Sequence, residues 1–245
     1  MVDHLFADDE LAALYDLFSP WERRDDLQFY MDLVMSAGAV LDVGCGTGAL
    51  LHRAREAGHA GRLCGLDPAA GMLAQARRRD DVEWVLGDLT SARWDREFDL
   101  IVMSGHAFQV LIEDEALRAS LAAVRGALGD DGRFAFETRN PLAREWERWI
   151  PSHAAKVVTA AGVPVHLTRQ VGAIEGDRVS FAHTFSSPAW ERPRISRSTL
   201  RFLGRDALSA FLSDAGLTIE RQYGDWDGSP LTAASPEIIT IARRV

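Results

Sequence analysis

The segment VLDVGCGTGALL, residues 40–51, constrains the fold of this chain more than any other stretch. Its first four residues, VLDV, are typical of a buried parallel strand. The next five, GCGTG, contain three glycines, whose conformational freedom disfavours both strand and helix interiors. The residues that follow, ALLHRAREAG, have helical spacing and end at a glycine. The segment therefore predicts a strand, a glycine-rich turn and a helix, an arrangement in which a ligand can approach the turn closely and meet helix N-terminal amides.

The alternation of strands and helices continues after this segment. GRLCGLD, VEWVLGD, FDLIVMSG and GRFAFET predict strands, whereas PAAGMLAQARRR and EDEALRASLAAVRGALG predict helices. Such alternation implies right-handed crossovers and a parallel, doubly wound sheet. Near the C-terminus, LTIERQYG and EIITIARRV predict two strands whose connection is too short for a helical crossover. These two strands should therefore be antiparallel, and we expect an α/β fold.

Two segments depart from this pattern. Residues 1–38 carry two amphipathic helices and predict an N-terminal helical cap. Residues 140–204 begin with PLAREWERWI, which predicts a short helix, and then change to period-2 alternation. Within them VPVHLTRQVGAI and RVSFAHTFSS flank the turn EGD and predict a hairpin, with which ISRSTLRFL could pair. We therefore expect a core of residues 39–139 and 205–245, and an antiparallel β-rich insertion of residues 140–204.

Composition limits the partners that such a chain can have. The net charge of −9 and the pI near 5.3 argue against a nucleic-acid partner, which normally requires a basic surface. The sequence contains no run of about 18 apolar residues, so it predicts no membrane span. The first residues, MVDHLFADDE, lack the basic start of a signal peptide. The two cysteines, Cys45 and Cys64, suit a reducing compartment. We expect a cytoplasmic protein without a membrane partner, and the sequence leaves its oligomeric state open.

Three carboxylates are predicted near the ends of three successive strands. GCGTGA also satisfies the dinucleotide pattern, so an NAD-type or flavin ligand is an alternative. However, Asp42 precedes the turn directly, where it would repel a pyrophosphate and hold a cation. Asp67 ends the next strand, where it could accept hydrogen bonds from ribose hydroxyls, and Asp88 ends the third, where it could accept from an adenine amine. These acids favour a nucleoside that carries positive charge, such as S-adenosyl-L-methionine.

VLDVGCGTG, GLDPAAGML, GDL and FDLIVMSG, in this order and spacing, resemble class I S-adenosylmethionine-dependent methyltransferases of the small-molecule type. The resemblance covers roughly residues 15–138 and the closing strand pair. It implies a Rossmann-like, seven-stranded sheet with an antiparallel last strand, a substrate lid in the insertion, and methyl transfer to an O or N atom of a small-molecule acceptor, with S-adenosyl-L-homocysteine as product. The cofactor-contacting positions that it implies are Tyr15, Asp42, Gly44, Cys45, Gly46, Gly48, Asp67, Pro68, Met72, Asp88, Leu89 and Ser104.

Several of these positions also have a structural interpretation. The resemblance assigns Asp42 and the glycine turn to the methionine end, Asp67 to the ribose, Met72, Leu89 and Asp88 to the adenine, and Tyr15 to closure over the cofactor. Asp67 could instead cap the helix after Pro68, and Asp88 could stabilise a turn. Met72 could belong to the core, and Tyr15 lies on an apolar helical face.

Two residues are candidates for a general base, which helps a hydroxyl acceptor but is dispensable for a neutral amine. His106 follows the fourth predicted strand, where it could instead be a neutral histidine that is hydrogen-bonded within a loop. Glu137 ends the fifth predicted strand, where it could instead pair with Arg139 or cap locally. The other histidines lack metal-ligand spacing, so we predict no metal. The insertion carries tryptophans and arginines that could receive an anionic group, although a solvated basic face suits most of these arginines better. A nicotinamide-dependent oxidoreductase and a non-enzymatic cofactor-binding protein remain alternatives.

Overall fold

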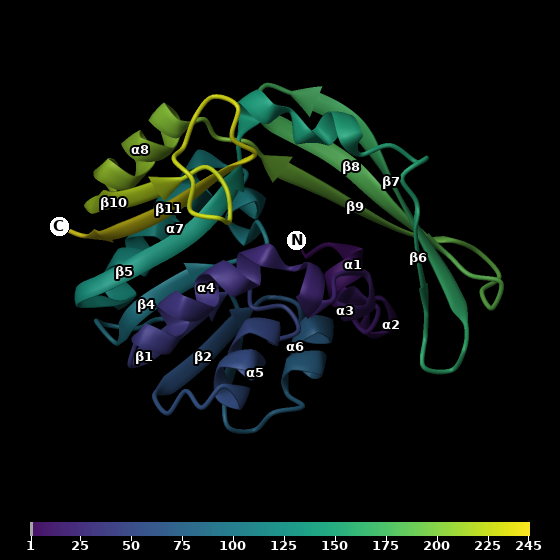
Figure 1. Ribbon diagram of the computed structural model, residues 1–245, viewed down its shortest axis with the longest axis horizontal. Helices are drawn as coiled ribbons and strands as arrows, with labels where there is room; N and C mark the ends of the chain where they lie inside the picture. Colours follow the sequence, from purple (N-terminus) through teal and green to yellow (C-terminus); the bar gives the residue numbers. More distant parts are fainter. Residues whose placement is uncertain (1) are drawn as a thin grey trace.

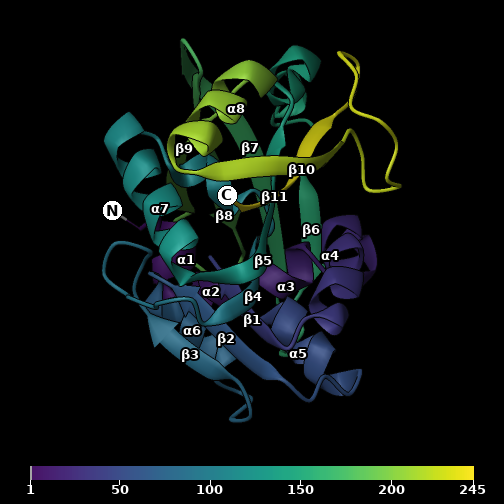
Figure 2. The same ribbon diagram turned by 90° about the vertical axis from the view of Figure 1, so that its left-hand side faces the viewer.

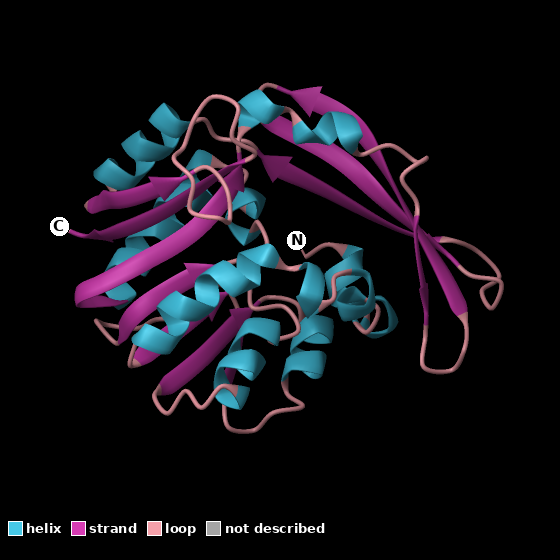
Figure 3. Ribbon diagram, viewed as in Figure 1, coloured by secondary structure: helices cyan, strands magenta, loops and turns pink. Residues whose placement is uncertain are grey.

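The computed structural model describes residues 2–245, which form two sheets (Figures 1 and 3). The larger sheet has seven strands in the order β10-β11-β5-β4-β1-β2-β3. Strand β11 is antiparallel to both of its neighbours, whereas β5, β4, β1, β2 and β3 are parallel to one another. This confirms the predicted α/β class and the antiparallel last strand. The strands are β1 (Ala39–Val43), β2 (Arg62–Asp67), β3 (Glu83–Leu86), β4 (Phe98–Met103), β5 (Leu128–Arg139), β10 (Leu217–Tyr223) and β11 (Glu237–Arg244).

Helices cover both faces of this sheet (Figure 2). On one face, α7 and α8 bury apolar residues such as Leu121 and Leu208 against Phe134 and Phe136 of β5. On the other face, α4 and α5 pack with Val40 and neighbouring residues in a second apolar cluster. The helices are α4 (Asp25–Ser36), α5 (Ala49–Glu56), α6 (Ala70–Ala76), α7 (Asp114–Ala127) and α8 (Arg205–Asp214), with a 3-10 turn η2 (Ala107–Val110) after β4.

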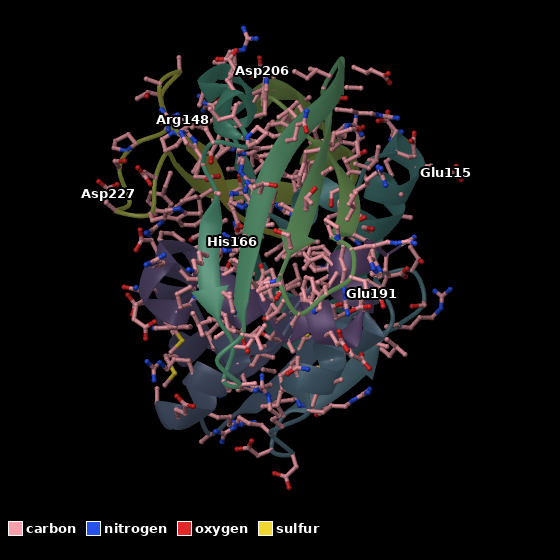
Figure 4. All side chains as sticks on the ribbon, turned by 90° about the vertical axis from the view of Figure 1, so that its right-hand side faces the viewer. Glu115, Arg148, His166, Glu191, Asp206 and Asp227 are labelled. Carbon is pink, nitrogen blue, oxygen red and sulfur yellow. The ribbon has the colours of Figure 1, made fainter. Side chains whose placement is uncertain are left out.

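The smaller sheet is formed by the residues between β5 and α8, and we call it the insertion sheet. Its four strands are antiparallel in the order β6-β7-β8-β9, and the predicted hairpin joins β7 to β8 at EGD. Alternate residues of β8 are buried. The outer face is solvated, as His166 on β7 shows (Figure 4). The strands are β6 (Ala155–Val158), β7 (Pro164–Glu175), β8 (Arg178–Ser186) and β9 (Arg194–Arg201).

The insertion differs from the prediction at one helix and contains one strand that was not predicted. PLAREWERWI forms two 3-10 turns, η3 (Pro141–Ala143) and η4 (Glu145–Arg148), in place of one helix, because Arg144 between them has a left-handed backbone with φ +47°. Strand β6 was not predicted, since AKVV is short and lacks buried alternation.

The N-terminal residues form short helices that connect the two sheets. The predicted helix at LAALYDLF is divided into α2 (Asp9–Ala12) and α3 (Tyr15–Phe18), and α1 (His4–Ala7) and the 3-10 turn η1 (Trp21–Arg23) flank them. Leu5, Leu11 and Leu14 pack with Val165 and Phe185 of the insertion sheet. Helices α1 and α2 also contact α6 of the core. None of the helices within residues 2–245 combines the length and the apolar character needed to cross a membrane.

Candidate active site at the carboxyl edge of the core sheet

The glycine turn after β1 has the left-handed backbone that its sequence predicts. Gly44, Gly46 and Gly48 have φ values of +74°, +56° and +78°, which L side chains rarely adopt. A Cβ at Gly44 would lie 2.8 Å from the Cβ of Ala107, and one at Gly48 would lie 2.5 Å from the ring of Trp84. In contrast, a Cβ at Gly46 would meet nothing within 4 Å. Gly44 and Gly48 therefore serve close packing, whereas the backbone of Gly46 faces open space.

Asp67 links this turn to helix α6. Its Oδ2 accepts a hydrogen bond of 2.8 Å from the N–H of Gly46, and its Oδ1 accepts one of 2.8 Å from the N–H of Ala69. The contact with Ala69 forms a turn before α6 and not the predicted helix cap, because the N-cap residue of α6 is Ala69 and it has no side-chain capping bond. Burial raises the pKa of Asp67, and the two amide contacts oppose that shift. Each carboxylate oxygen has a second lone pair, so these two contacts do not prevent Asp67 from accepting hydrogen bonds from a ligand.

Asp42 is a buried carboxylate without a partner on one oxygen. The residue is 1% exposed, and within residues 2–245 its Oδ1 accepts no hydrogen bond. Burial, and then the negative charge of Asp67, raise the pKa of Asp42 to about 7. A buried, unpartnered carboxylate oxygen is costly, and a cationic ligand beside it would remove that cost.

The three residues expected at the adenine, Asp88, Met72 and Leu89, belong to a turn and to two different apolar clusters. The Oδ1 of Asp88 accepts hydrogen bonds from the Thr90 N–H (2.8 Å), the Thr90 hydroxyl (2.6 Å) and the Ser91 N–H (3.0 Å). These contacts, the Thr90 hydroxyl first, lower the pKa of Asp88 and match the turn alternative. Met72 packs in one apolar cluster with Tyr15, whereas Leu89 belongs to the main core.

The other expected contact residues border the same edge. Cys45 is buried beside the glycine turn, and burial raises the pKa of its thiol. Pro68 is exposed between β2 and α6. Ser104 is buried directly after β4.

The two candidate bases, His106 and Glu137, lie in contact with each other. The backbone N–H of His106, at φ +64°, donates to Glu137 Oε1 over 2.5 Å. The hydroxyl of Tyr30 in α4 donates to Glu137 Oε2, also over 2.5 Å. The Nε2 of His106 lies 3.0 Å from Glu237 Oε1 on β11. Glu137 therefore forms no pair with Arg139 and instead joins α4, β5 and the loop after β4.

Burial disfavours charge throughout this cluster. It raises the pKa of Glu137 to about 8 and that of Glu237 to about 8, and it lowers the pKa of His106 well below its usual value. His106 is thus a neutral imidazole at physiological pH. Its Nδ1 forms no hydrogen bond within residues 2–245, so this nitrogen can accept a proton when Nε2–H is donated to Glu237.

Sequence reasoning missed four residues of this edge. Tyr30 lies in one of the two helices predicted within residues 1–38 and Glu237 in the predicted last strand, and neither residue was expected at the site. Arg24 and Asp26 form an ion pair of 2.7 Å, and a Cβ at Gly105 would lie 3.1 Å from Arg24 Nη2. The cluster RRDD, residues 23–26 at the start of α4, was the only signal in the sequence for this pair.

Among residues 2–245, no three His, Cys, Asp or Glu side chains are grouped so that they could hold a metal ion.

Comparison with known proteins agrees with this geometry. Residues 40–132 match a family model described as a methyltransferase domain. The chain is 27% identical to a cypemycin N-terminal methyltransferase of Streptomyces sp, over 84% of this chain and 82% of the relative. It is 27% identical to the dTDP-3-amino-3,6-dideoxy-alpha-D-glucopyranose N,N-dimethyltransferase of Streptomyces fradiae, over 93% of this chain and 91% of the relative.

A solved S-adenosylmethionine-dependent methyltransferase from Clostridium acetobutylicum has the same fold, with a TM-score of 0.75 at 17% identity over 96% of this chain and 98% of that one. The family match shows a methyltransferase domain at residues 40–132, and the strand order and the glycine turn agree with the resemblance to class I S-adenosylmethionine-dependent methyltransferases. The chain is therefore an enzyme whose cofactor is S-adenosyl-L-methionine, as the sequence predicted.

Proposed function

We propose that this enzyme transfers the methyl group of S-adenosyl-L-methionine to an O or N atom of a small-molecule acceptor. The observation that carries the cofactor site is the unpartnered Oδ1 of Asp42 beside the open backbone of Gly46. A cationic ligand that carries hydroxyl groups is complementary to this buried acid and to the free lone pairs of Asp67. We assign the remaining cofactor contacts as the resemblance implies. Met72, Asp88 and Leu89 would contact the adenine, and Tyr15 would close over the cofactor.

The bound cofactor supplies the reactive methyl group, so the protein mainly orients the acceptor and excludes water. We assign the proton of a hydroxyl acceptor to Nδ1 of His106, which is neutral and carries no other hydrogen bond. In this assignment Glu237 accepts a hydrogen bond from Nε2–H of His106 and thereby fixes the imidazole tautomer. Both oxygens of Glu137 are occupied, so Glu137 acts as a positioning residue that holds the backbone of His106.

The acceptor would lie between the carboxyl edge of the core sheet and the insertion sheet. In this proposal residues 39–139 and 205–245 bind the cofactor, residues 140–204 form the substrate lid, and residues 1–38 form a cap. The N,N-dimethyltransferase to which the chain is similar over most of its length acts, by its name, on an amino sugar. That similarity favours a small molecule over a nucleic acid, and so does the net charge of −9.

Isothermal titration of the purified protein with S-adenosylmethionine, S-adenosylhomocysteine and NADH tests the cofactor site. We expect micromolar binding of both adenosyl ligands and no binding of NADH. Binding of NADH alone would mean that the acids around the glycine turn were assigned to the wrong ligand.

His106→Ala tests the proposed base once an acceptor is found by screening. For a hydroxyl acceptor, we expect kcat to fall by about 10²-fold or more, with the Kd for S-adenosylhomocysteine unchanged. His166→Ala, which changes an exposed histidine on the outer face of β7, is the matched control. Unchanged turnover in His106→Ala with a hydroxyl acceptor would refute the assignment of the base.

A further inference from the structure

Two arginines, one at the end of core strand β5 and one on the insertion sheet, share one aromatic ring. The guanidinium carbon of Arg139, the last residue of β5, lies 5.2 Å from the ring centre of Trp149. That of Arg169 on β7 lies 4.9 Å from the same ring and 5.6 Å from the ring of Phe181. Burial, and then the positive charge of Arg139, lower the pKa of Arg169 to about 10, so the two cations are near enough to repel each other.

Neither arginine has a carboxylate partner within residues 2–245. Other arginines of the insertion form ion pairs: Arg178 with Glu113 at 2.9 Å and Arg201 with Asp177 at 2.8 Å. In contrast, Arg139 donates from Nη1 to the amide oxygen of Gln109 over 2.9 Å. Arg169 donates from Nε to the imidazole of His183 over 2.8 Å. Both cations are thus satisfied by neutral acceptors, although partly buried guanidinium groups usually take a carboxylate.

Hydrogen-bond donors without an acceptor gather in the same cluster. His183 accepts from Arg169 at Nε2, so its proton is on Nδ1, and this buried Nδ1–H has no partner within residues 2–245. The indole N–H groups of Trp146 and Trp149 are also buried and unpartnered. His183, Phe181 and Trp149 are linked by ring contacts of about 5 Å. The unpartnered polar atoms of this cluster are donors, so the group that would complete it is an acceptor.

The position of the cluster connects it with the proposed acceptor site. Arg139 follows Glu137 by two residues on β5 and pairs with Glu237 in the register of β5 and β11. Its positive charge also acts on His106, whose pKa it helps to lower. An anion held by these arginines would therefore lie near the proposed base.

We propose that Arg139 and Arg169, with Trp149 and His183, bind an anionic group of the methyl acceptor, either a carboxylate or a phosphate. This inference rests on the proposed function, and it narrows the acceptor to small anionic molecules. Two guanidinium groups present the planar sets of N–H donors that recognise carboxylate and phosphate oxygens, and the aromatic rings exclude water around them.

Isothermal titration of the full chain, saturated with S-adenosylhomocysteine at constant ionic strength, tests the proposal with inorganic pyrophosphate and citrate as probes. We expect at least one probe to bind the wild type and its Kd to rise tenfold or more in Arg139→Gln and in Arg169→Gln. Arg197→Gln, which changes an exposed arginine of β9, should leave the Kd unchanged. Binding of pyrophosphate alone assigns a phosphate, binding of citrate alone assigns a carboxylate, and binding of both supports the shared anion chemistry.

Binding of S-adenosylhomocysteine, measured first, separates this proposal from the proposed function. If S-adenosylhomocysteine binds and neither probe does, or if both Gln variants bind the probes as the wild type does, the anion site is refuted and the cofactor site stands. If a Gln variant no longer binds S-adenosylhomocysteine, the probe titration is repeated with the Lys variant at the same position. Lysine keeps the charge but not the planar donor set, so the Kd for the probe must still rise.

Discussion

The carboxyl edge of the core sheet and the facing side of the insertion bury ionisable groups of opposite type, carboxyl groups on the first and arginines on the second. On the core edge, burial raises the pKa of Asp42 to about 7 and that of Glu137 to about 8. On the insertion, burial and then the charge of Arg139 lower the pKa of Arg169 to about 10. In each region burial thus disfavours the charged form of the groups it encloses. This difference underlies our proposals that the core edge binds a cationic cofactor and that the two arginines bind an anionic acceptor.

Asp67→Ala tests the acidic region and has the largest expected effect. Losing a charge-assisted hydrogen-bond pair should weaken binding of S-adenosylmethionine by roughly 2–4 kcal/mol, or about thirty-fold and more, in isothermal titration. Asp67→Asn, which keeps an acceptor oxygen, should lose less. Asp80→Ala, at an exposed aspartate after α6, should bind as the wild type does. Retained binding in Asp67→Ala would contradict the ribose assignment.

Glu137→Gln tests whether the acidic region destabilises the fold at high pH. The folded-state pKa of Glu137, about 8, lies above its ordinary value of 4.5, so the folded protein keeps a proton that the unfolded chain loses. The contribution of this residue to stability is therefore present below pH 4.5 and is lost as the pH rises through 8. The variant cannot lose this proton, so between pH 6 and pH 9 its free energy of unfolding should fall by about 1–3 kcal/mol less than that of the wild type in urea titrations.

Glu115→Gln, at an exposed glutamate of α7 (Figure 4), is the matched control and should keep the pH dependence of the wild type. An equal fall in stability for Glu137→Gln and the wild type would show that the Glu137 carboxyl is not held protonated in the fold.

Gly46→Ala tests the open backbone of the glycine turn and has the smallest expected effect. Its φ of +56° closely matches that of Gly176 in the β7–β8 hairpin, +62°, and a Cβ at either position meets nothing within 4 Å. Both Ala variants should lose about 1 kcal/mol of stability through left-handed strain. Only Gly46→Ala should also weaken cofactor binding, by several-fold, because its methyl group occupies the space in which the ligand would approach. Equal affinities of the two variants would show that Gly46 does not face the cofactor.

The core could be predicted from the sequence because its signals are local. The strand, turn and helix of residues 40–56 follow from neighbouring residues, and the antiparallel last strand follows from the length of one loop. The insertion was less predictable: the left-handed Arg144 divides a segment that has helical composition, and β6 has no buried alternation. The prediction of a substrate lid there stays a prediction.

The site shows the same contrast. Asp42, Asp67 and the glycines belong to one continuous pattern. Glu237 lies opposite Arg139 only through the register of β11 on β5, and Arg169 lies opposite His183 only through that of β7 on β8. Strand registers between distant segments depend on tertiary packing, so a single sequence does not reveal these pairs.

The N-terminal helices give the insertion a third attachment to the core. The chain itself joins the two parts twice, after β5 and before α8. At the other end, the N–H of Leu5 donates to Ser196 of β9 over 2.9 Å, and Arg194 pairs with Asp8 and Glu10, while α1 and α2 rest on α6 (Figure 1). A part held at three points cannot swing as a flap on a single hinge. If an acceptor entered by such a movement, the N-terminal strap, residues 3–18, would first have to break its hydrogen bond and ion pairs with β9.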